Sequence, residues 1–382
     1  MRAALERVSI ESLCANVTSG GTPSRADPSL WEDGVMPWFK TGELKDWYVD
    51  DAEEKIAAKA ISQSSAKVFP PNTVLMAMYG DGKTITSLGI LRNEAATNQA
   101  CCAMIADPTK SNFLYLFYAL KYHRHELLQL VVAGAQRNLS GGIIRKFKIL
   151  WYPLPVQNRI ADLLSAYDDL IENNRRRMEL LEESARLLYR EWFVRLRFPG
   201  YEHTRISDSV PDGWERVPLE GALVLQRGFD LPTQDRQQGT VPIYGSTGIL
   251  GYHDKAKASA PGVVTGRSGT LGEVQYVAED YWPLNTALWV KEFRRVTPLF
   301  ALFLLREMDL RQYNGGASVP TLDRKSVHRV EVLIPSTLLL RSFDELAADF
   351  FAQIKNLNTQ NQKLRAARDL LLPRLMSGDI AA

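Results

Sequence analysis

The sequence predicts an α+β protein in which two similar mixed α/β domains are separated by two long helices that pair as an antiparallel coiled coil. Three observations predict this fold class. They are an internal repeat of roughly 180 residues, short apolar strands that enter glycine-rich turns in each copy, and a heptad pattern after each copy. If two such copies pair helix to helix about a pseudo-two-fold axis, the helices run antiparallel.

The bulk composition is that of a soluble globular protein. The chain has 382 residues, of which 45% are hydrophobic and 24% charged, enough for two or three domains. Its apolar runs are far shorter than the ~20 residues of a membrane-spanning helix, and no apolar leader opens the chain, so we expect a cytoplasmic protein. Lys and Arg number 46 against 44 Asp and Glu, so net charge does not argue for a nucleic-acid partner.

The repeat can be followed along the chain as matched segments. Each copy has two strands that run into Thr/Gly turns, then an apolar helix, and it ends with a strand that closes on proline. The matched segments are "MPWFKTGEL" from Met36 with "VPIYGSTGIL" from Val241, "NTVLMAMYGDGK" from Asn72 with "PGVVTGRSGT" from Pro261, "NQA" at Asn98 with "NTA" at Asn285, the apolar stretches from Phe113 and Leu299, and "AGAQRNLSGG" from Ala133 with "GGASVPTLDR" from Gly315.

A helix of about 34 residues, about 50 Å long, is predicted after each copy. Apolar residues recur at alternating spacings of four and three, which is typical of a coiled-coil seam. The first seam consists of Leu164, Tyr167, Ile171, Asn174, Met178, Leu181 and Leu188, and the second of Phe350, Ile354, Leu357, Asn361, Leu364 and Leu371, with Arg368 also on it. A polar residue such as Asn174 on this seam can fix the helix register.

These patterns divide the chain into five segments. The linker is placed where Pro, Gly, Ser and Asp cluster and helical periodicity stops. The predicted bounds are 1–155 for the first domain, 156–196 for the central helix, 197–215 for the linker, 216–336 for the second domain and 337–382 for the C-terminal helix.

Cofactor loops and metal ligands are not indicated. The glycine runs at Gly245 and Gly266 have neither dinucleotide nor Walker A spacing, so we interpret them as strand turns. Cys14, Cys101 and Cys102 form neither a disulfide framework nor a CxxC pair. We expect no metal and no cofactor in this chain.

Several charged groups are interpreted as solvated surface. His123 and His125 lie two residues apart and should occupy different faces of a surface helix, which argues against a metal site with Glu126. The "EEK" at Glu53 is interpreted as a solvated face, not half of a nuclease signature. The pairs 168–169 and 182–183 are carboxylates that we place away from the seam, where they keep the helix soluble.

The predicted strand ends carry polar and basic side chains in both copies. Arg, Lys, Asn and Gln can read base edges, and Ser and Thr suit phosphates, although ordinary solvated loops are the alternative for any single residue. The candidates are Lys40, Thr41, Tyr79, Lys83, Gln136, Arg137, Asn138, Arg145 and Lys146 in the first copy, and Arg227, Tyr244, Ser246, Thr247, Arg267, Ser268, Ser318, Arg324 and Lys325 in the second.

Three segments resemble a known family. "YPLPVQNRIADLLSAYDDLIENNRRRMELLEESARLLYREWFVRLRFPGYE" resembles the central spacer region of the specificity subunits of Type I restriction-modification systems. "VPDGWE" resembles the start of their second recognition domain, and "LRAARDLLLPRLMSGDI" their C-terminal spacer region. The duplicated layout extends the resemblance over essentially the whole chain.

The resemblance implies that each domain reads one half of a bipartite, asymmetric sequence in double-stranded DNA, and that the coiled coil sets the spacing and docks the modification subunits. It implies a non-catalytic subunit. Two modification subunits would supply S-adenosylmethionine and methylate adenine, and restriction subunits would translocate and cleave DNA with ATP and Mg²⁺.

Two other functions stay open on the sequence alone. One is a protein-binding coiled-coil adaptor, and the other is a self-contained DNA nuclease or methyltransferase. The heptad register places Arg175, Arg176 and Arg177 on the flanks and back of the first long helix. We therefore expect them to be solvated or to face a partner subunit, with base reading left to the two domains.

Overall fold

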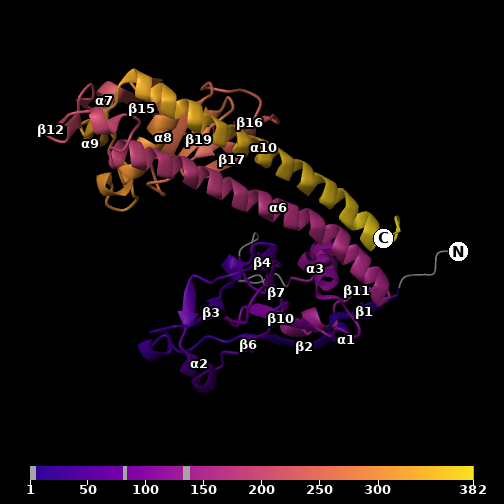
Figure 1. Ribbon diagram of the computed structural model, residues 1–382. Coiled ribbons are helices and arrows are strands. Elements are labelled where there is room, and N and C mark those ends of the chain that lie inside the picture. The colour runs from indigo at the N-terminus through magenta and orange to yellow at the C-terminus, as the bar shows by residue number, and fades with distance from the viewer. Residues whose placement is uncertain (1–5, 81–83, 132–137, 382) are drawn as a thin grey trace. The chain divides into compact units, whose positions relative to one another are not determined.

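The computed structural model describes residues 6–80, 84–131 and 138–381. The chain divides into two compact units, which we call unit 1 (Met1–Asn173 with Gln360–Ala382) and unit 2 (Asn174–Thr359). Two long helices, α6 (Leu154–Tyr189) and α10 (Thr337–Met376), contribute one portion to each unit (Figure 1). The finer segment bounds predicted from the sequence stay predictions.

Unit 1 contains two mixed sheets and a short antiparallel strand pair. The larger sheet has the strand order β2-β10-β7-β8-β4, the smaller β5-β3-β9-β6, and the pair is β1-β11. The strands are β1 Arg7–Ser9, β2 Cys14–Ser19, β3 Met36–Phe39, β4 Trp47–Val49, β5 Glu54–Ile56, β6 Val68–Phe69, β7 Val74–Ala77, β8 Leu88–Leu91, β9 Ala95–Thr97, β10 Cys101–Ala106 and β11 Lys148–Leu150. The helices are α1 Ile10–Leu13, α2 Ala58–Gln63, α3 Phe113–Tyr122, α4 Arg124–Gln129 and α5 Gly141–Lys146.

Unit 2 repeats this plan with one strand fewer in each of its two larger sheets, and it has an additional strand pair, β12-β13. Its sheets have the orders β15-β21-β18-β19 and β17-β16-β20, and β14 pairs with β22 as β1 pairs with β11. The strands are β12 Ile206–Ser207, β13 Val210–Pro211, β14 Glu215–Pro218, β15 Leu223–Arg227, β16 Val241–Gly245, β17 Gly248–His253, β18 Gly262–Gly266, β19 Val274–Val277, β20 Trp282–Pro283, β21 Ala287–Phe293 and β22 Glu331–Ile334. The helices are α7 Leu219–Ala222, α8 Pro298–Glu307 and α9 Arg324–His328.

Equivalent strands pair in the same register in both units. β3 runs parallel to β9 with Trp38 opposite Ala96, and β16 runs parallel to β20 with Ile243 opposite Trp282. The central strand β7 lies between β8 and β10, and β18 lies between β19 and β21, so in each unit it pairs with the next strand along the chain and with a later one. The predicted fold class, two similar mixed α/β domains with two long helices, is therefore confirmed.

The sequence alignment of Asn98 with Asn285 is wrong by one residue. The Asn98 N–H donates to Phe39 O at 3.0 Å, and the equivalent donor in unit 2 is Leu284, whose N–H reaches Tyr244 O at 2.8 Å. Aligning the two identical asparagines shifted the alignment by one residue, because the asparagine occupies a different position in each turn.

Each unit has its own apolar core around one helix. In unit 1 residues 115–120 of α3 are all buried, and in unit 2 residues 299–305 of α8 are all buried. A helix that is apolar on every face needs cover on every side. The sheet, the adjoining long-helix portions and the short helices supply that cover.

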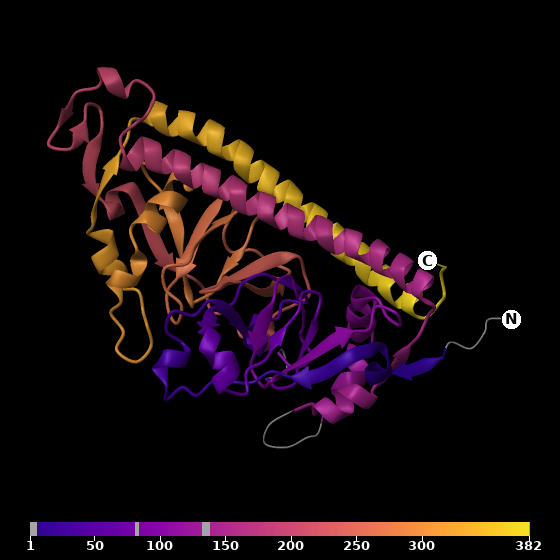
Figure 2. The same ribbon diagram turned by 60° about the horizontal axis from the view of Figure 1, so that its bottom comes forward.

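The long helices run antiparallel within each unit. In unit 1 Leu164 of α6 belongs to the same buried cluster as Leu372 and Leu375 of α10, and Figure 2 shows these portions side by side. In unit 2 the ring of Tyr189 lies 6.0 Å from that of Phe343. With 36 and 40 residues, α6 and α10 are about 54 and 60 Å long.

Candidate nucleic-acid interface

Each unit contains its own copy of a contact that we call the loop junction. It is formed by residues 78–79 with 138–139 in unit 1, and by residues 267–268 with 321–322 in unit 2. Backbone hydrogen bonds of 2.8 Å close it at equivalent places, from the N–H of residue 139 to the oxygen of residue 78 and from residue 322 to residue 267. Isolated bridges pair Tyr79 with Asn138 and Ser268 with Thr321. The loop after β7 or β18 is thereby fixed beside the start of α5 or α9.

Arginine side chains gather near the loop junction of unit 2. Arg267 Nη1 donates to Asn285 O at 2.8 Å, so its guanidinium is held against the loop before β21. Asp230 accepts from the Asn285 side-chain amide and lies 3.4 Å from Arg227 Nη2. Arg227 is about half-exposed and Arg267 is partly exposed. The cluster presents two positioned guanidinium groups, a donor type suited to base edges and phosphates.

The turn between β16 and β17 lies against the same loop. A Cβ on Gly266 would overlap Thr270 O and stand 3.2 Å from Ser246 O, so only glycine permits this approach of backbones. Ser246 is partly exposed and Thr247 is exposed. The glycine-rich motifs are therefore strand turns that place the polar residues 246–247 and 267–268 together.

The remaining candidates of unit 2 lie at other places. Ser318 is exposed in the loop that leads into the junction. Arg324 and Lys325 begin α9, and Arg324 Nη1 approaches Leu225 O at 3.5 Å. Tyr244 packs inward with its ring 5.8 Å from that of Tyr281, and burial raises its pKa to about 12.

In unit 1 the junction presents different side chains. Tyr79 is 38% exposed and Asn138 is exposed. Lys40 Nζ lies 2.9 Å from Glu53 and 3.1 Å from Glu54, and these carboxylates, Glu53 first, raise the pKa of Lys40. Thr41 follows in a short 3-10 turn and is partly exposed. The charge of Lys40 is thus partly compensated within unit 1.

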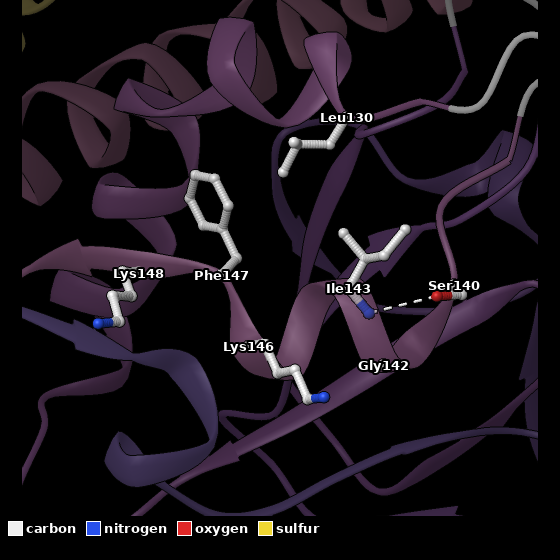
Figure 3. A pocket seen from close by; sticks show the side chains of 7 residues that line it. All are labelled: Leu130, Ser140, Gly142, Ile143, Lys146, Phe147 and Lys148. Carbon is white, nitrogen blue, oxygen red and sulfur yellow. Dashed lines mark hydrogen bonds between the residues drawn. The ribbon is translucent and has the colours of Figure 1, made fainter.

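Two further candidates lie on α5. Arg145 Nε donates to Val17 O at 3.0 Å, while Lys146 lines an open hollow of about 510 Å³. Figure 3 shows Ser140 Oγ accepting from the Ile143 N–H at the start of this helix, with the Lys146 side chain projecting from it. The other lining residues are Leu130, Gly142, Phe147 and Lys148.

Three candidates, Lys83, Gln136 and Arg137, lie outside the described residues. The contacts of all the candidates with DNA stay predictions.

The seam positions of both long helices are buried or partly buried. Leu164, Ile171, Asn174, Leu357 and Asn361 are less than a tenth exposed. The partly exposed seam residues are Tyr167, Met178, Leu181, Leu188, Phe350, Ile354, Leu364 and Leu371.

The polar residues of the long helices fall into two groups. Asn361 Nδ2 donates to Ile171 O at 3.2 Å, which satisfies an amide on the apolar seam. Arg175, Arg176 and Arg177 are exposed, off the seam, as predicted.

The prediction that Asp168 lies in solvent is wrong. Asp168 is 5% exposed, accepts a 2.7 Å hydrogen bond from Tyr118 Oη and forms an ion pair with Arg368. The heptad pattern describes only the face toward α10, and Asp168 faces α3 as well, so its burial depends on the tertiary structure. An arginine on the opposite seam, Arg368, was the available signal. The neighbouring Asp169 is exposed.

Glu182, also assigned to solvation, lies 2.6 Å from Arg306 Nη1.

His123 and His125 do lie on different faces, but the surface prediction is wrong for His123. Its side chain is 1% exposed, and Nδ1 lies 2.8 Å from Glu126 Oε1. Burial lowers the pKa of His123 against the opposing effect of Glu126. Among the residues that the structure describes, no group of three His, Cys, Asp or Glu side chains is arranged to hold a metal ion.

The cysteines are not placed for nucleophilic chemistry. All three are buried, and burial raises the pKa of Cys14 and Cys102 to about 12, so their thiols stay protonated at neutral pH. Within the described ranges, no helix is long and apolar enough to cross a membrane.

Comparisons with known proteins agree with this architecture. A family model for the Type I restriction modification DNA specificity domain matches residues 5–183. The Type I restriction enzyme MjaIX specificity subunit of Methanocaldococcus jannaschii is 25% identical over 95% of this chain and 91% of its own length. The EcoprrI specificity subunit of Escherichia coli is 23% identical over 84% of this chain and 81% of its own.

A solved structure shares the fold. The crystal structure of a Type I restriction-modification system S subunit from M. genitalium superimposes with a TM-score of 0.59 at 16% identity, covering 98% of this chain and 97% of that one.

Proposed function

The chain belongs to the family of Type I restriction-modification specificity subunits, and from this premise we propose that each of its two units reads one half of a bipartite, asymmetric DNA sequence. The protein is a DNA sequence-recognition subunit. Our proposal concerns how it reads: the side chains around each loop junction contact one half-site, and the long helices set the spacing between the two.

The observation that carries the proposal is one scaffold with two sets of side chains. The loop junction closes with the same hydrogen bonds in both units. At the equivalent positions, however, unit 1 has Tyr79 where unit 2 has Ser268, and Asn138 where unit 2 has Thr321. Because base recognition depends on the donors and acceptors offered at each position, different side chains on one scaffold favour two different half-sites.

We further propose that catalysis resides in partner subunits. Two modification subunits would bind S-adenosylmethionine and methylate adenine, and restriction subunits would use ATP and Mg²⁺, all in the cytoplasm. Leu180 and Leu187 support docking of partners on α6, since they are 67% and 48% exposed, lie seven residues apart and so share a face. The domain and helix bounds predicted from the sequence are part of this proposal.

Methylation mapping tests the proposal. The chain is co-expressed with its modification subunit, and methylated adenines are located by single-molecule sequencing. We expect one bipartite motif with different halves. Arg267→Ala should reduce methylation at that motif, whereas the matched control Arg341→Ala, an exposed arginine on α10, should not. Methylation by the chain alone would favour an enzyme. If both variants assemble with the modification subunit and both methylate the motif as the wild type does, a protein adaptor would be favoured.

A further inference from the structure

One strand of unit 2 exposes three large apolar side chains in succession. On β17, Ile249 is 49% exposed, Leu250 48% and Tyr252 52%. We call these three residues the β17 patch. β17 is an edge strand, paired only with β16 in the order β17-β16-β20. Single exposed apolar residues are ordinary, but three within four residues at a sheet edge indicate a contact surface.

A β-bulge gives the patch its shape. Tyr244 pairs with Ile249 and Ile243 pairs with Gly251, which leaves Leu250 as the extra residue of the bulge. A bulge turns consecutive side chains toward a common direction that a regular strand would not allow. Leu250 is held in place as well, because its Cδ1 occupies the space that a Cβ on residue 245 would need.

The β17 patch lies next to the polar residues 246–247 and 267–268 of unit 2. It follows directly on the turn at 246–247, and Ser246 O lies near Gly266, one residue before Arg267. A Cβ on Gly251 would lie 3.7 Å from Arg236 Nη1, so a second guanidinium borders the patch. A guanidinium group therefore lies beside the apolar patch, which suits a polyanion that also carries apolar groups.

The fold does not require an apolar strand here. In unit 1 the equivalent strand is β5, because Trp38 pairs with Glu54 where Ile243 pairs with Gly251. That strand carries Glu54 and Lys55, and Glu54 forms ion pairs with Arg25 and Lys40. The β17 patch is thus particular to unit 2 and points to what unit 2 binds.

We infer that the β17 patch contacts thymine methyl groups in the half-site read by unit 2. The inference rests on the proposed function. Base edges in the major groove offer hydrogen-bond donors and acceptors, and the one apolar group among them is the 5-methyl of thymine. Ile and Leu side chains gain free energy when such a group and their own apolar surface leave water together. A half-site that contains a methylated adenine also contains its paired thymine.

Deoxyuridine substitution tests this contact without altering the protein. Deoxyuridine pairs as thymine does but lacks the methyl group. The assembled complex with modification subunits is titrated with duplexes that carry deoxyuridine in one half-site or the other. We expect wild-type affinity to fall about fourfold for each methyl group removed from the half-site of unit 2. For substitution in the half-site of unit 1, any change in affinity should be the same with and without the patch residues.

Variants locate the effect at the patch. Ile249→Ala with Leu250→Ala should bind the thymine duplex more weakly and lose the response to deoxyuridine. Ile206→Ala, a 47% exposed isoleucine on β12, is the matched control and should keep that response.

The outcomes separate this inference from the proposed function. Equal wild-type affinity for the thymine duplex and for the duplex with deoxyuridine in the half-site of unit 2 overturns the thymine contact. If the same complex still methylates one bipartite motif, the proposed function stands. If less modification subunit co-purifies with the double variant, and the variant keeps the deoxyuridine response, the patch is a protein contact and the inference is overturned. Loss of the response in the double variant alone, with Ile206→Ala unchanged, supports it.

Discussion

The buried pair Asp168–Arg368 gives the sharpest prediction about stability. The side chains are 5% and 12% exposed, and Tyr118 Oη donates to the same carboxylate at 2.7 Å. Arg368→Leu leaves a buried carboxylate that keeps its hydrogen bond from Tyr118 but has lost its ion pair, and breaking such a pair costs about 3–5 kcal/mol. Removing both charges with Asp168→Leu and Arg368→Leu should restore most of that loss, because the uncompensated charge disappears.

Hydrogen exchange of peptides from α3 measures this effect within unit 1. α3 carries Tyr118 and is buried in the same core, so its amides report the opening of unit 1. We expect exchange in Arg368→Leu to be roughly 150 to 5,000 times faster than in the wild type. Arg365→Leu, an exposed arginine one turn away on α10, should change exchange little. Equal exchange in Arg368→Leu and Arg365→Leu, or a double variant as unstable as the single, would refute the reasoning.

Three more predictions concern the helices and unit 2. Asn174→Leu should leave the bases read unchanged in a methylation map, because Asn174 lies on the seam; a changed motif would contradict this. One heptad added to both α6 and α10 lengthens each by about 10.5 Å, so the half-sites in the mapped motif should move apart by about three base pairs, and unchanged spacing would refute the ruler. His328 Nε2 accepts from the Leu225 N–H at 3.0 Å, and burial lowers the pKa of His328. The unfolded state then binds more protons, so exchange protection of unit 2 should fall as pH drops below about 6.5, less steeply in His328→Gln; parallel pH profiles would contradict this.

The architecture was predictable because it repeats and because its periods are long. Heptad spacing that continues from Leu164 to Leu188, and again from Phe350 to Leu371, identifies a paired helix whatever surrounds it. The strand and turn pattern of Val74–Ala77 matches that of Gly262–Gly266 because both strands are buried at equivalent places in the corresponding sheets of the two units. Short turns carry less information, which is why identical asparagines at 98 and 285 misled the alignment by one residue.

The interface was predictable only as a set of loop positions. Arg227 and Arg267 come together through Asp230 and Asn285, and nothing in the spacing of those residues announces these contacts. The same holds for the burial of Asp168, which depends on a tyrosine from α3. Side-chain periodicity on one helix describes its main contact face, and a second contact face requires the folded structure.

The most direct test exchanges the recognition domain of unit 1 and leaves that of unit 2 unchanged. Residues 1–150 are replaced with those of a relative of different specificity, the chimera is co-expressed with its modification subunit, and methylated adenines are mapped by single-molecule sequencing. The account predicts that one half of the bipartite motif changes while the other half and the spacing stay the same. A motif that changes in both halves, or in neither, would contradict it.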